Sequence, residues 1–363
     1  MCLVLVACAK GGADTTTDGS QPPDGNTTFT PSSCPAGQLA TDISPTGDVT
    51  CKTVDTSITS AITNQCAIHL GWRDECNGCA LPPTKFGSIG KQCVTGTGAQ
   101  NVCVTPTLGG KPTPLFGLNF DGDANDDDKL YGGLHCVPPV PATGITSCPA
   151  DQFIVGAGTC ASVGDVVIDY VRTSCALYLG WQDNCDGCAT QPGKWGFAGD
   201  AGCTVGAGIN NTCVTTTLGG EMVNLIGLNT DGDVNDDDKF HVGLDCRPPT
   251  PATTSATTCP AGQFVAATEL DGTFRCESVA PLVADVIASR CTLTFGWHDN
   301  CDGCLTPPTK FGSVRVGACT LGGGLSNTCS SFTLGGRTVN MFGLNTDGDV
   351  NGDDTFYVGF RCE

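Results

Sequence analysis

An acidic segment that recurs three times is the part of this chain best suited to chemistry. It reads Asp-Gly-Asp-Ala-Asn-Asp-Asp-Asp at 121–128, Asp-Gly-Asp-Val-Asn-Asp-Asp-Asp at 231–238 and Asp-Gly-Asp-Val-Asn-Gly-Asp-Asp at 347–354. The three segments hold 14 of the 37 acidic residues, and so many close carboxylates repel one another unless a cation neutralises them. Hard cations take about six to eight oxygen ligands, which a turning loop with carboxylates at alternate positions supplies. The pattern therefore predicts three calcium loops.

We expect the side chains at positions 1, 3, 5, 7 and 8 of each loop to bind Ca²⁺. They are Asp121, Asp123, Asn125, Asp127 and Asp128 in the first copy, Asp231, Asp233, Asn235, Asp237 and Asp238 in the second, and Asp347, Asp349, Asn351, Asp353 and Asp354 in the third. Asn345 and a backbone carbonyl are further candidate ligands. Mg²⁺ fits less well because it rarely uses an all-protein cage. A solvated acidic turn without metal is the alternative.

The first half of each loop resembles the Asp-x-Asp-x-Asn/Asp-Gly loops of EF-hand, dockerin and thrombospondin type 3 modules. In the third copy Gly352 stands at the sharp turn. The resemblance ends at position 12, where Gly132, Val242 and Val358 replace the bidentate Glu of an EF-hand. We therefore expect a metal clip between two strands instead of an EF-hand.

A second recurring motif is Gly-Trp-x-Asp-x-Cys-Asn/Asp-Gly-Cys. Its members are Trp72, Asp74, Cys76 and Cys79, then Trp181, Asp183, Cys185 and Cys188, and finally Trp297, Asp299, Cys301 and Cys304. We expect structural disulfides, because a zinc site would need a second cysteine pair and a redox Cys-x-x-Cys usually begins a helix. Asp183, Asn184 and Asp186 could hold a second cation, and whether Asp74, Asp183 and Asp299 form such a site stays open. The tryptophans follow apolar runs, so we expect them in the core.

Aromatic residues after a recurring lysine are candidates for weak sugar binding at the surface. They are Phe86, Trp195 and Phe311. Catalysis is not expected, because none of the four histidines (69, 135, 241 and 298) recurs at an equivalent position in another copy. We predict that the protein is not an enzyme.

Composition places the chain in an oxidising compartment. It has 26 cysteines among 363 residues, and aromatic residues make up only 6%, so we expect disulfides to replace a large apolar core in each repeat. A net charge of −20 with only 17 Lys and Arg argues against nucleic acid as a partner. No apolar run reaches the ~18–20 residues of a membrane span.

The first eight residues suggest a lipid anchor. Leu5-Val6-Ala7-Cys8 resembles the lipobox of bacterial lipoproteins, which implies lipidation of Cys8 and an outer-membrane location. The apolar run is shorter than a usual signal sequence and lacks a basic start. Residues 9–33 are polar, with Gly, Thr and Pro, and predict a flexible tether.

Three tandem repeats follow, each with eight cysteines. We place them at 34–136, 148–246 and 259–363, with 1–33 as signal remnant and tether. Pro-rich linkers at 137–147 and Pro/Thr-rich linkers at 247–258 predict stiff spacers between separate beads.

Each repeat is expected to be mostly β, a small α+β domain with β-hairpins, one short helix and a calcium loop. The first cysteine interval varies in length, which favours a disulfide that closes a surface hairpin; the other six cysteines allow about 15 connectivities. A helix around Val283–Ile287, a strand up to Trp297, a hairpin on Gly219-Gly220 and a strand over Phe240–Cys246 complete the pattern.

Together these features predict a calcium-binding, disulfide-stabilised extracellular repeat protein with a structural or adhesive role at the cell surface. A calcium-dependent, lectin-like carbohydrate-binding protein is the alternative, and a subunit of an extracellular filament is a further one. Expected partners are calcium and either surface glycans, other surface proteins or copies of the same chain. A membrane would be contacted only through the lipid anchor.

Overall fold

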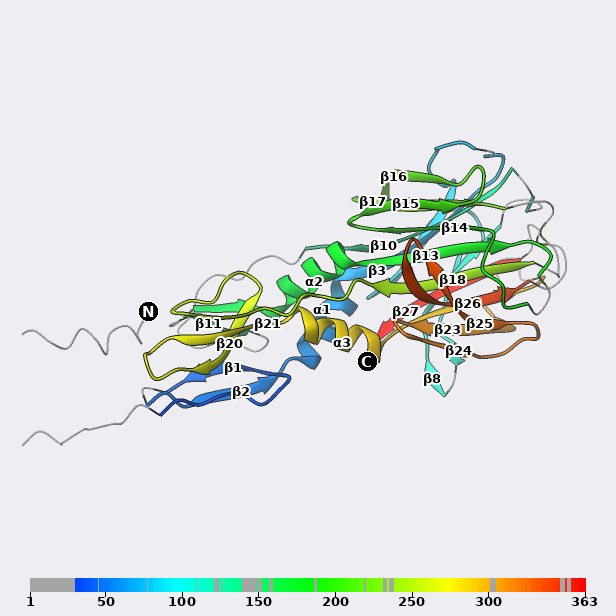
Figure 1. Ribbon diagram of the computed structural model, residues 1–363. Coiled ribbons are helices and arrows are strands. Elements are labelled where there is room, and N and C mark those ends of the chain that lie inside the picture. Colours follow the sequence, from blue (N-terminus) through cyan, green and yellow to red (C-terminus); the bar gives the residue numbers. More distant parts are fainter. Residues whose placement is uncertain are drawn as a thin grey trace, which may run out of the picture. The chain divides into compact units, whose positions relative to one another are not determined.

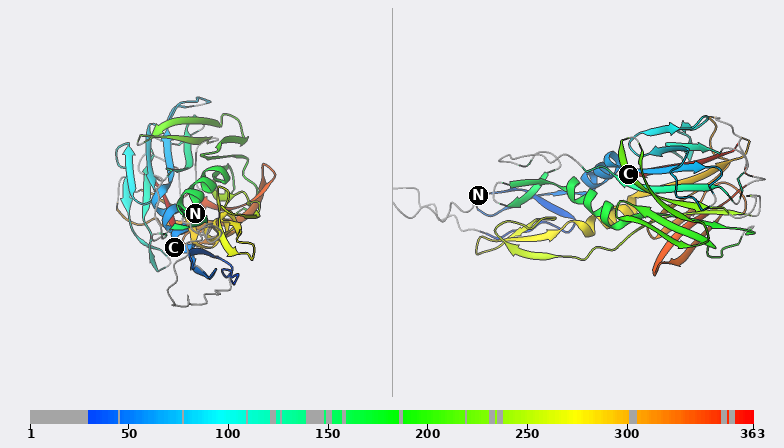
Figure 2. Two further views of the ribbon diagram at one scale, coloured as in Figure 1. Left: turned by 90° about the vertical axis from the view of Figure 1, so that its left-hand side faces the viewer. Right: turned by 90° about the horizontal axis from the view of Figure 1, so that it is seen from above.

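The computed structural model describes residues 30–363 except 45, 77, 109, 121–123, 126, 139–147, 149–151, 157–158, 186–187, 219, 231–233, 235–237, 301–304, 347–349 and 351–353. The predicted lipidation site at Cys8 and most of the tether therefore lie outside the described residues. The chain divides into two compact units (Figures 1 and 2). Residues 1–58, 139–167 and 249–283 make up unit 1, and the remainder makes up unit 2. Each unit thus takes one segment from every repeat.

Unit 1 consists of β-hairpins, one from each repeat. The strands are β1 (Gln38–Ile43) with β2 (Val49–Thr53), β11 (Gln152–Gly156) with β12 (Thr159–Ser162), and β20 (Gln263–Thr268) with β21 (Phe274–Ser278). A disulfide closes each hairpin as predicted: Cys34–Cys51, Cys148–Cys160 and Cys259–Cys276. β19 (Thr253–Ala256) also pairs with β21. The second predicted linker is thus partly a sheet strand, and treating it purely as a spacer was wrong.

The hairpins of unit 1 share one small core. The rings of Phe153 and Phe264 lie 6.3 Å apart, edge to face, and Ala40, Val265 and Phe274 are buried in the same apolar cluster as Ile154. Backbone hydrogen bonds link the copies: Cys34 N donates to Ala266 O at 2.8 Å, and Cys259 N to Val155 O at 2.6 Å. The hairpins are therefore not independent.

One helix per repeat follows the hairpin, as predicted: α1 (Asp55–Gln65), α2 (Val163–Ser174) and α3 (Ala280–Arg290). Each buries one apolar stripe, represented by Ile58 and Ile62 in α1 and by Val283 and Ile287 in α3. Among the described helices, none is long and apolar enough to cross a membrane.

Unit 2 contains the remaining strands. Repeat 1 contributes β3 (Cys66–Arg73), β4 (Lys85–Ile89), β5 (Cys93–Thr97), β6 (Val102–Val104), β7 (Thr107–Leu108), β8 (Lys111–Pro112), β9 (Leu115–Asn119) and β10 (Lys129–Cys136). Repeat 2 contributes β13 (Cys175–Gln182), β14 (Lys194–Gly199), β15 (Gly202–Ala207), β16 (Thr212–Leu218), β17 (Glu221–Asn229) and β18 (Lys239–Cys246). Repeat 3 contributes β22 (Cys291–His298), β23 (Lys310–Arg315), β24 (Ala318–Leu321), β25 (Thr328–Leu334), β26 (Arg337–Asn345) and β27 (Thr355–Cys362). The mostly β fold and the hairpin β16–β17 are confirmed.

The repeats exchange strands in a closed cycle (Figure 1). The sheet orders are β5-β4-β3-β10-β17-β16, β15-β14-β13-β18-β26-β25 and β24-β23-β22-β27-β9-β6. Each sheet thus takes four strands from one repeat and two from another. Repeat 2 donates two strands to the sheet of repeat 1, repeat 3 donates two to that of repeat 2, and repeat 1 donates two to that of repeat 3. The expectation of three separate beads is therefore wrong, although the repeat bounds in the sequence remain a prediction.

Disulfides close the sheets and their corners. Cys66–Cys136, Cys175–Cys246 and Cys291–Cys362 each join two paired strands of one repeat. Cys93–Cys103, Cys203–Cys213 and Cys319–Cys329 each join the edge strand of one sheet to the edge strand of the next. Exposed sheet edges invite pairing with other chains, and in unit 2 every edge strand of the large sheets carries such a staple.

The three repeats build a single large aromatic core in unit 2. Trp72, Trp181 and Trp297 are at most 1% exposed, as predicted. The ring of Phe356 lies 4.8 Å from Trp297 and 4.6 Å from Phe240, which belongs to another repeat. Every residue of β10 and β18 is buried. We expected disulfides to replace a large core; in fact these strands are covered on both faces because the repeats pool their apolar residues.

A single repeat should not fold as a monomer. In residues 148–246 alone, β17 would lack β10 and β18 would lack β26, and the shared aromatic core would be open. We expect the isolated second repeat to be unfolded at low concentration and to gain β-structure only as a trimer, in which β17 of each copy pairs with β18 of the next. Sedimentation with circular dichroism over a concentration series measures this, with the full chain as control. A folded monomer would contradict the shared core.

A buried histidine should make unit 2 sensitive to acid. His241 is 1% exposed, and burial lowers its pKa to about 3 because the charged imidazolium loses its hydration. The unfolded chain titrates near 6.5, so between these values it binds more protons than the folded chain, and stability falls as pH drops below 6.5. Each pH unit costs up to ~1.4 kcal/mol.

Tyr131 and Tyr357, both 0% exposed, occupy the positions of His241 in the other repeats. His241→Tyr should therefore flatten the loss of unfolding free energy between pH 6.5 and 4, measured by denaturant titration. His298→Gln is the matched control, because His298 is partly exposed and Gln182 is its counterpart. Equal slopes for His241→Tyr and the parent would show that His241 does not carry the effect.

Candidate metal centre

Each of the three acidic loops connects two strands that belong to different sheets of unit 2. They join β9 to β10, β17 to β18 and β26 to β27, so strands flank each loop as expected. The described residues at the middle of the loops form a closed ring of backbone hydrogen bonds. Ala124 N donates to Val350 O at 2.8 Å, Val350 N to Val234 O at 2.9 Å, and Val234 N to Ala124 O at 3.1 Å. The three loops therefore meet at one place, which their separation in the sequence does not reveal.

Five of the predicted ligands are described: Asn125, Asp127, Asp128, Asp238 and Asp354. The others lie outside the described residues, namely Asp121, Asp123, Asp231, Asp233, Asn235, Asp237, Asp347, Asp349, Asn351 and Asp353.

In the first repeat, the two recurring motifs form one carboxylate cluster. Oxygen atoms of Asp74, Asp127 and Asp128 all lie within 4.8 Å of one another. Asp74 is exposed, Asp127 half-buried and Asp128 fully buried. Burial, together with a hydrogen bond to Asp74, raises the pKa of Asp128 to about 7. Ionising all three carboxyl groups at once is therefore unfavourable, and a bound cation would favour their ionised forms. Asp74 therefore lies beside the end of the acidic loop of its own repeat.

The last Asp of each loop also fixes the turn of the Trp-x-Asp motif. Asp128 Oδ1 accepts a hydrogen bond from Glu75 N at 3.0 Å, and its Oδ2 accepts one from Asn125 N at 2.9 Å. Asp238 and Asp354 accept the matching bonds from Asn184 N and Asn300 N, both at 2.9 Å.

The three turn residues that donate these bonds, Glu75, Asn184 and Asn300, share φ of 53°. This left-handed conformation suits Asn better than Glu. The bond to a buried carboxylate holds it in place in all three copies. The carboxylates at position 8 of the acidic loops thus combine a structural role with their predicted metal role.

A buried lysine anchors the start of each acidic loop, which the sequence analysis missed. Lys85 Nζ donates to Asn119 Oδ1 at 3.0 Å and to Phe120 O at 2.9 Å. Lys194 and Lys310 make the same bonds to Asn229 and Thr230 and to Asn345 and Thr346. The regular recurrence of Lys before an aromatic residue was the available signal, but it was interpreted only through its aromatic neighbour.

The same asparagines connect the repeats. Asn345 Nδ2 donates to Asp238 O at 3.3 Å, and Asn229 Nδ2 donates to Asp128 O at 3.2 Å. Asn345 therefore uses its oxygen for Lys310 and its nitrogen for the neighbouring repeat. Its assignment as a further calcium ligand is not supported by this geometry.

A second buried lysine follows the loop in two repeats. Lys129 Nζ donates to Cys79 O at 2.6 Å and Lys239 Nζ to Cys188 O at 2.9 Å. Burial lowers the pKa of Lys129 to about 8. Cys76–Cys79 and Cys185–Cys188 are disulfides, as expected for structural cysteines, whereas 301–304 lie outside the described residues. In these two repeats the lysine that follows the acidic loop is thus hydrogen-bonded to the segment closed by the short disulfide.

The candidate sugar-binding aromatics differ in exposure. Trp195 is 9% exposed and packs with Tyr178, Phe332 and Leu334, so it does not present a free ring to a ligand. Phe86 and Phe311 are half-buried. The surface interpretation is therefore wrong for Trp195, because the neighbouring repeat covers it.

Comparisons with known proteins give no relative from which a function could be inferred. No protein-family model, curated protein or solved structure matches the chain.

Proposed function

We propose that this protein is a calcium-stabilised extracellular scaffold whose three acidic loops bind Ca²⁺ at a common junction of the repeats. The observation that carries the proposal is the ring of hydrogen bonds between Ala124, Val234 and Val350. The ring joins the middles of three loops that each hold four or five acidic residues. Like charges in one place repel strongly at reduced dielectric, so the folded junction needs positive charge.

The buried lysines supply part of this charge. Each loop has one lysine at its start, and two loops have a second at their end. Thr355 replaces the second lysine in repeat 3. With at most two lysines against four or five carboxylates in each loop, an excess of negative charge remains for a divalent cation to neutralise.

The donor set fits calcium. Asp74, Asp127 and Asp128 offer oxygen atoms only, which hard cations prefer, whereas zinc selects nitrogen and sulfur ligands. A bound Ca²⁺ would supply positive charge among these carboxylates and keep Asp128 ionised. Extracellular calcium modules bind with dissociation constants on the order of 10⁻⁴–10⁻³ M, so occupancy would follow the calcium concentration outside the cell.

A structural or adhesive role suits this construction. The described disulfides fit an oxidising, extracellular environment, and disulfides join the edge strands of neighbouring sheets in unit 2. Attachment to the outer membrane through Cys8 would place the scaffold at the bacterial surface.

Calcium should stabilise the full chain, and Asp74 should contribute to the effect. At millimolar excess over chelator we expect calcium to raise the free energy of unfolding by roughly 1–3 kcal/mol. Asp74→Asn removes one exposed ligand, so it should weaken the calcium response while leaving the melting temperature in chelator equal or slightly higher. Thermal melts with and without calcium, together with metal analysis after dialysis, measure both effects.

Asp271→Asn is the matched control, because Asp271 lies in an exposed hairpin turn in unit 1. It should keep the full calcium response. Identical melts of the parent in calcium and in chelator, with no metal retained, would rule out the proposal. If Asp74→Asn and Asp271→Asn reduced the calcium-induced stabilisation equally, Asp74 would not be a calcium ligand.

A further inference from the structure

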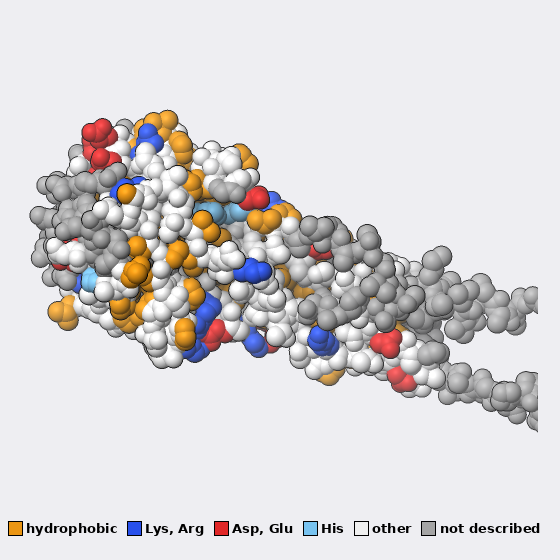
Figure 3. All heavy atoms as spheres, turned by 180° about the vertical axis from the view of Figure 1, so that it is seen from behind, with side chains coloured by type: hydrophobic (Ala, Val, Ile, Leu, Met, Phe, Trp, Pro, Cys, Tyr) orange, Lys and Arg blue, Asp and Glu red, His pale blue; other side chains and the backbone are white. Residues whose placement is uncertain are grey.

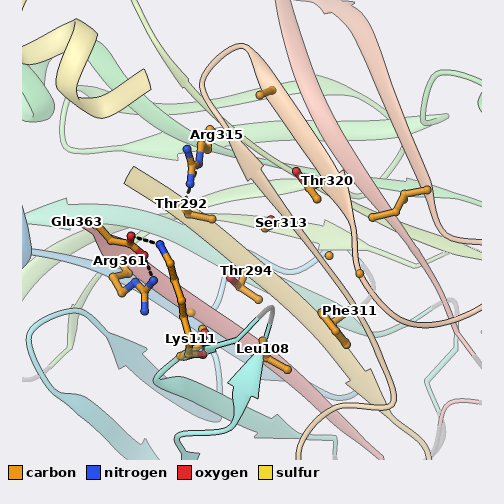
Figure 4. Close-up of a pocket in the computed structure, with 16 residues that line it drawn as sticks. Leu108, Lys111, Thr292, Thr294, Phe311, Ser313, Arg315, Thr320, Arg361 and Glu363 are labelled. Atoms are coloured by element: carbon orange, nitrogen blue, oxygen red, sulfur yellow. Dashed lines mark hydrogen bonds and ion pairs between the residues drawn. The ribbon is translucent and has the colours of Figure 1, made fainter. Parts of the chain in front are cut away.

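A cavity of about 480 Å³ lies in unit 2 where repeat 1 meets the sheet of repeat 3 (Figure 4). It lies on the face of β22 and β27 opposite to Trp297 and Phe356. Its volume is within the range of small-molecule sites, roughly 300–1,000 Å³. Most of its wall comes from β22, β23, β24 and β27, and repeat 1 contributes Leu108, Lys111 and Thr113. None of the lining residues belongs to an acidic loop.

Small side chains open this cavity. Thr294 and Ser313 are register partners on β22 and β23. Their counterparts in repeat 2 are Tyr178 and Phe197, also register partners, whose rings stack at 4.7 Å. There, Trp195 and the incoming strands of repeat 3 fill the space with an apolar cluster. The exchange of two aromatic residues for two hydroxyls thus converts a packed face into a hollow.

The cavity is cationic within a strongly acidic chain. Lys111, Arg315 and Arg361 line it, with Glu363 as the acidic member of the wall. Lys111 and Arg361 both pair with the carboxylate of Glu363. Arg315 donates to neutral oxygens, from Nε to Thr292 Oγ1 and from a terminal nitrogen to Ser289 O, both at 2.8 Å. Its guanidinium retains N–H groups that can form a two-point contact with a carboxylate.

The remaining wall suits a sugar ring. Thr294, Ser313 and Thr320 line the same cavity as Phe311 and contribute hydroxyl groups to its wall (Figure 4). A pyranose presents hydroxyls at its edge and C–H groups on its faces, and these C–H groups pack against the electron-rich face of an aromatic ring. Hydroxyl-bearing side chains pair readily with hydroxyls because each both donates and accepts.

A second hollow of about 520 Å³ adjoins the first. The two share Leu108 and Phe311, and the second is otherwise lined mainly by apolar residues such as Leu305 and Pro308, with Thr105 and Thr107 as its polar members. Phe311 therefore stands between a charged, hydroxyl-rich end and an apolar end. Such an elongated site can accommodate a ligand longer than one monosaccharide.

We propose that this cavity binds an acidic saccharide, with its carboxylate at Arg315 and its sugar ring against Phe311. A simple carboxylate would leave the aromatic and hydroxyl wall unused, and a neutral sugar would leave Arg315 unused. The site goes beyond the calcium scaffold proposed above and does not depend on metal binding.

The test uses the full chain and three matched probes in ligand-observed NMR titrations: methyl β-D-glucuronide, methyl β-D-glucoside and N-acetylglutamate amide. We expect the glucuronide to bind at least tenfold more tightly than the other two. Arg315→Gln should remove this preference and reduce affinity for the glucuronide about tenfold. Arg275→Gln, which removes a positive charge from unit 1, should bind like the parent.

A second variant fills the cavity with the side chains that repeat 2 uses. Thr294→Tyr combined with Ser313→Phe should abolish binding, and a melting temperature close to that of the parent would show that the fold is retained. The proposal is overturned if no probe binds, if the filled variant binds like the parent, or if the glucoside matches the glucuronide. Preferential binding of the glutamate derivative would replace it with an acidic-peptide site.

Discussion

The structure of unit 2 depends on one constraint: no repeat can complete a sheet by itself. β10, β18 and β27 each need a hairpin from another repeat on their open side, and the cycle closes because repeat 1 donates to repeat 3. Antiparallel pairing satisfies the backbone groups of these strands, which are buried and have no access to water. The aromatic core and the meeting of the acidic loops both follow from this exchange. Each acidic loop connects the last strand that its repeat donates to the strand of the same repeat that receives a hairpin, as β17 is connected to β18. Three exchanges therefore bring three loops together.

The cycle also explains how so few aromatic residues sustain a core. Small domains bury too little surface for stability, and a single repeat is below the size at which a core suffices without staples. Pooling three repeats places Trp72, Trp181 and Trp297 in one interior. The composition suggests that the disulfides replace an apolar core, but here they have another role. Cys93–Cys103 and its equivalents link neighbouring sheets at their edges, where they restrain the chain at the points most open to unwanted pairing.

Local features could be predicted from the sequence, but the partners of the strands could not. The cysteine-closed hairpins, the helices, the buried tryptophans and the strands around the acidic loops each depend on neighbouring residues with clear periodicity or turn signals. The exchange depends on contacts between residues a hundred or more positions apart, such as Lys239 with Asn345. The repeat pattern in the sequence is equally compatible with three separate domains. The joining of Asp74 to Asp127 and Asp128 was missed for the same reason: two motifs were treated as two sites. The burial of Trp195 was missed because another repeat covers it.

The near-threefold arrangement constrains some positions far more than others. In the aromatic core the ring of Phe356 packs against rings of all three repeats. The copies also agree there: each has a buried tryptophan and a buried aspartate that accepts a hydrogen bond from a left-handed turn residue. A residue on an outer face contacts only one neighbouring repeat, so it can change without disturbing the others. The register pair Thr294–Ser313 corresponds to Tyr178–Phe197 in repeat 2 and to His69–Ser88 in repeat 1. One face can therefore bind a ligand while the equivalent face of another repeat is packed for stability, an asymmetry that three identical chains could not have.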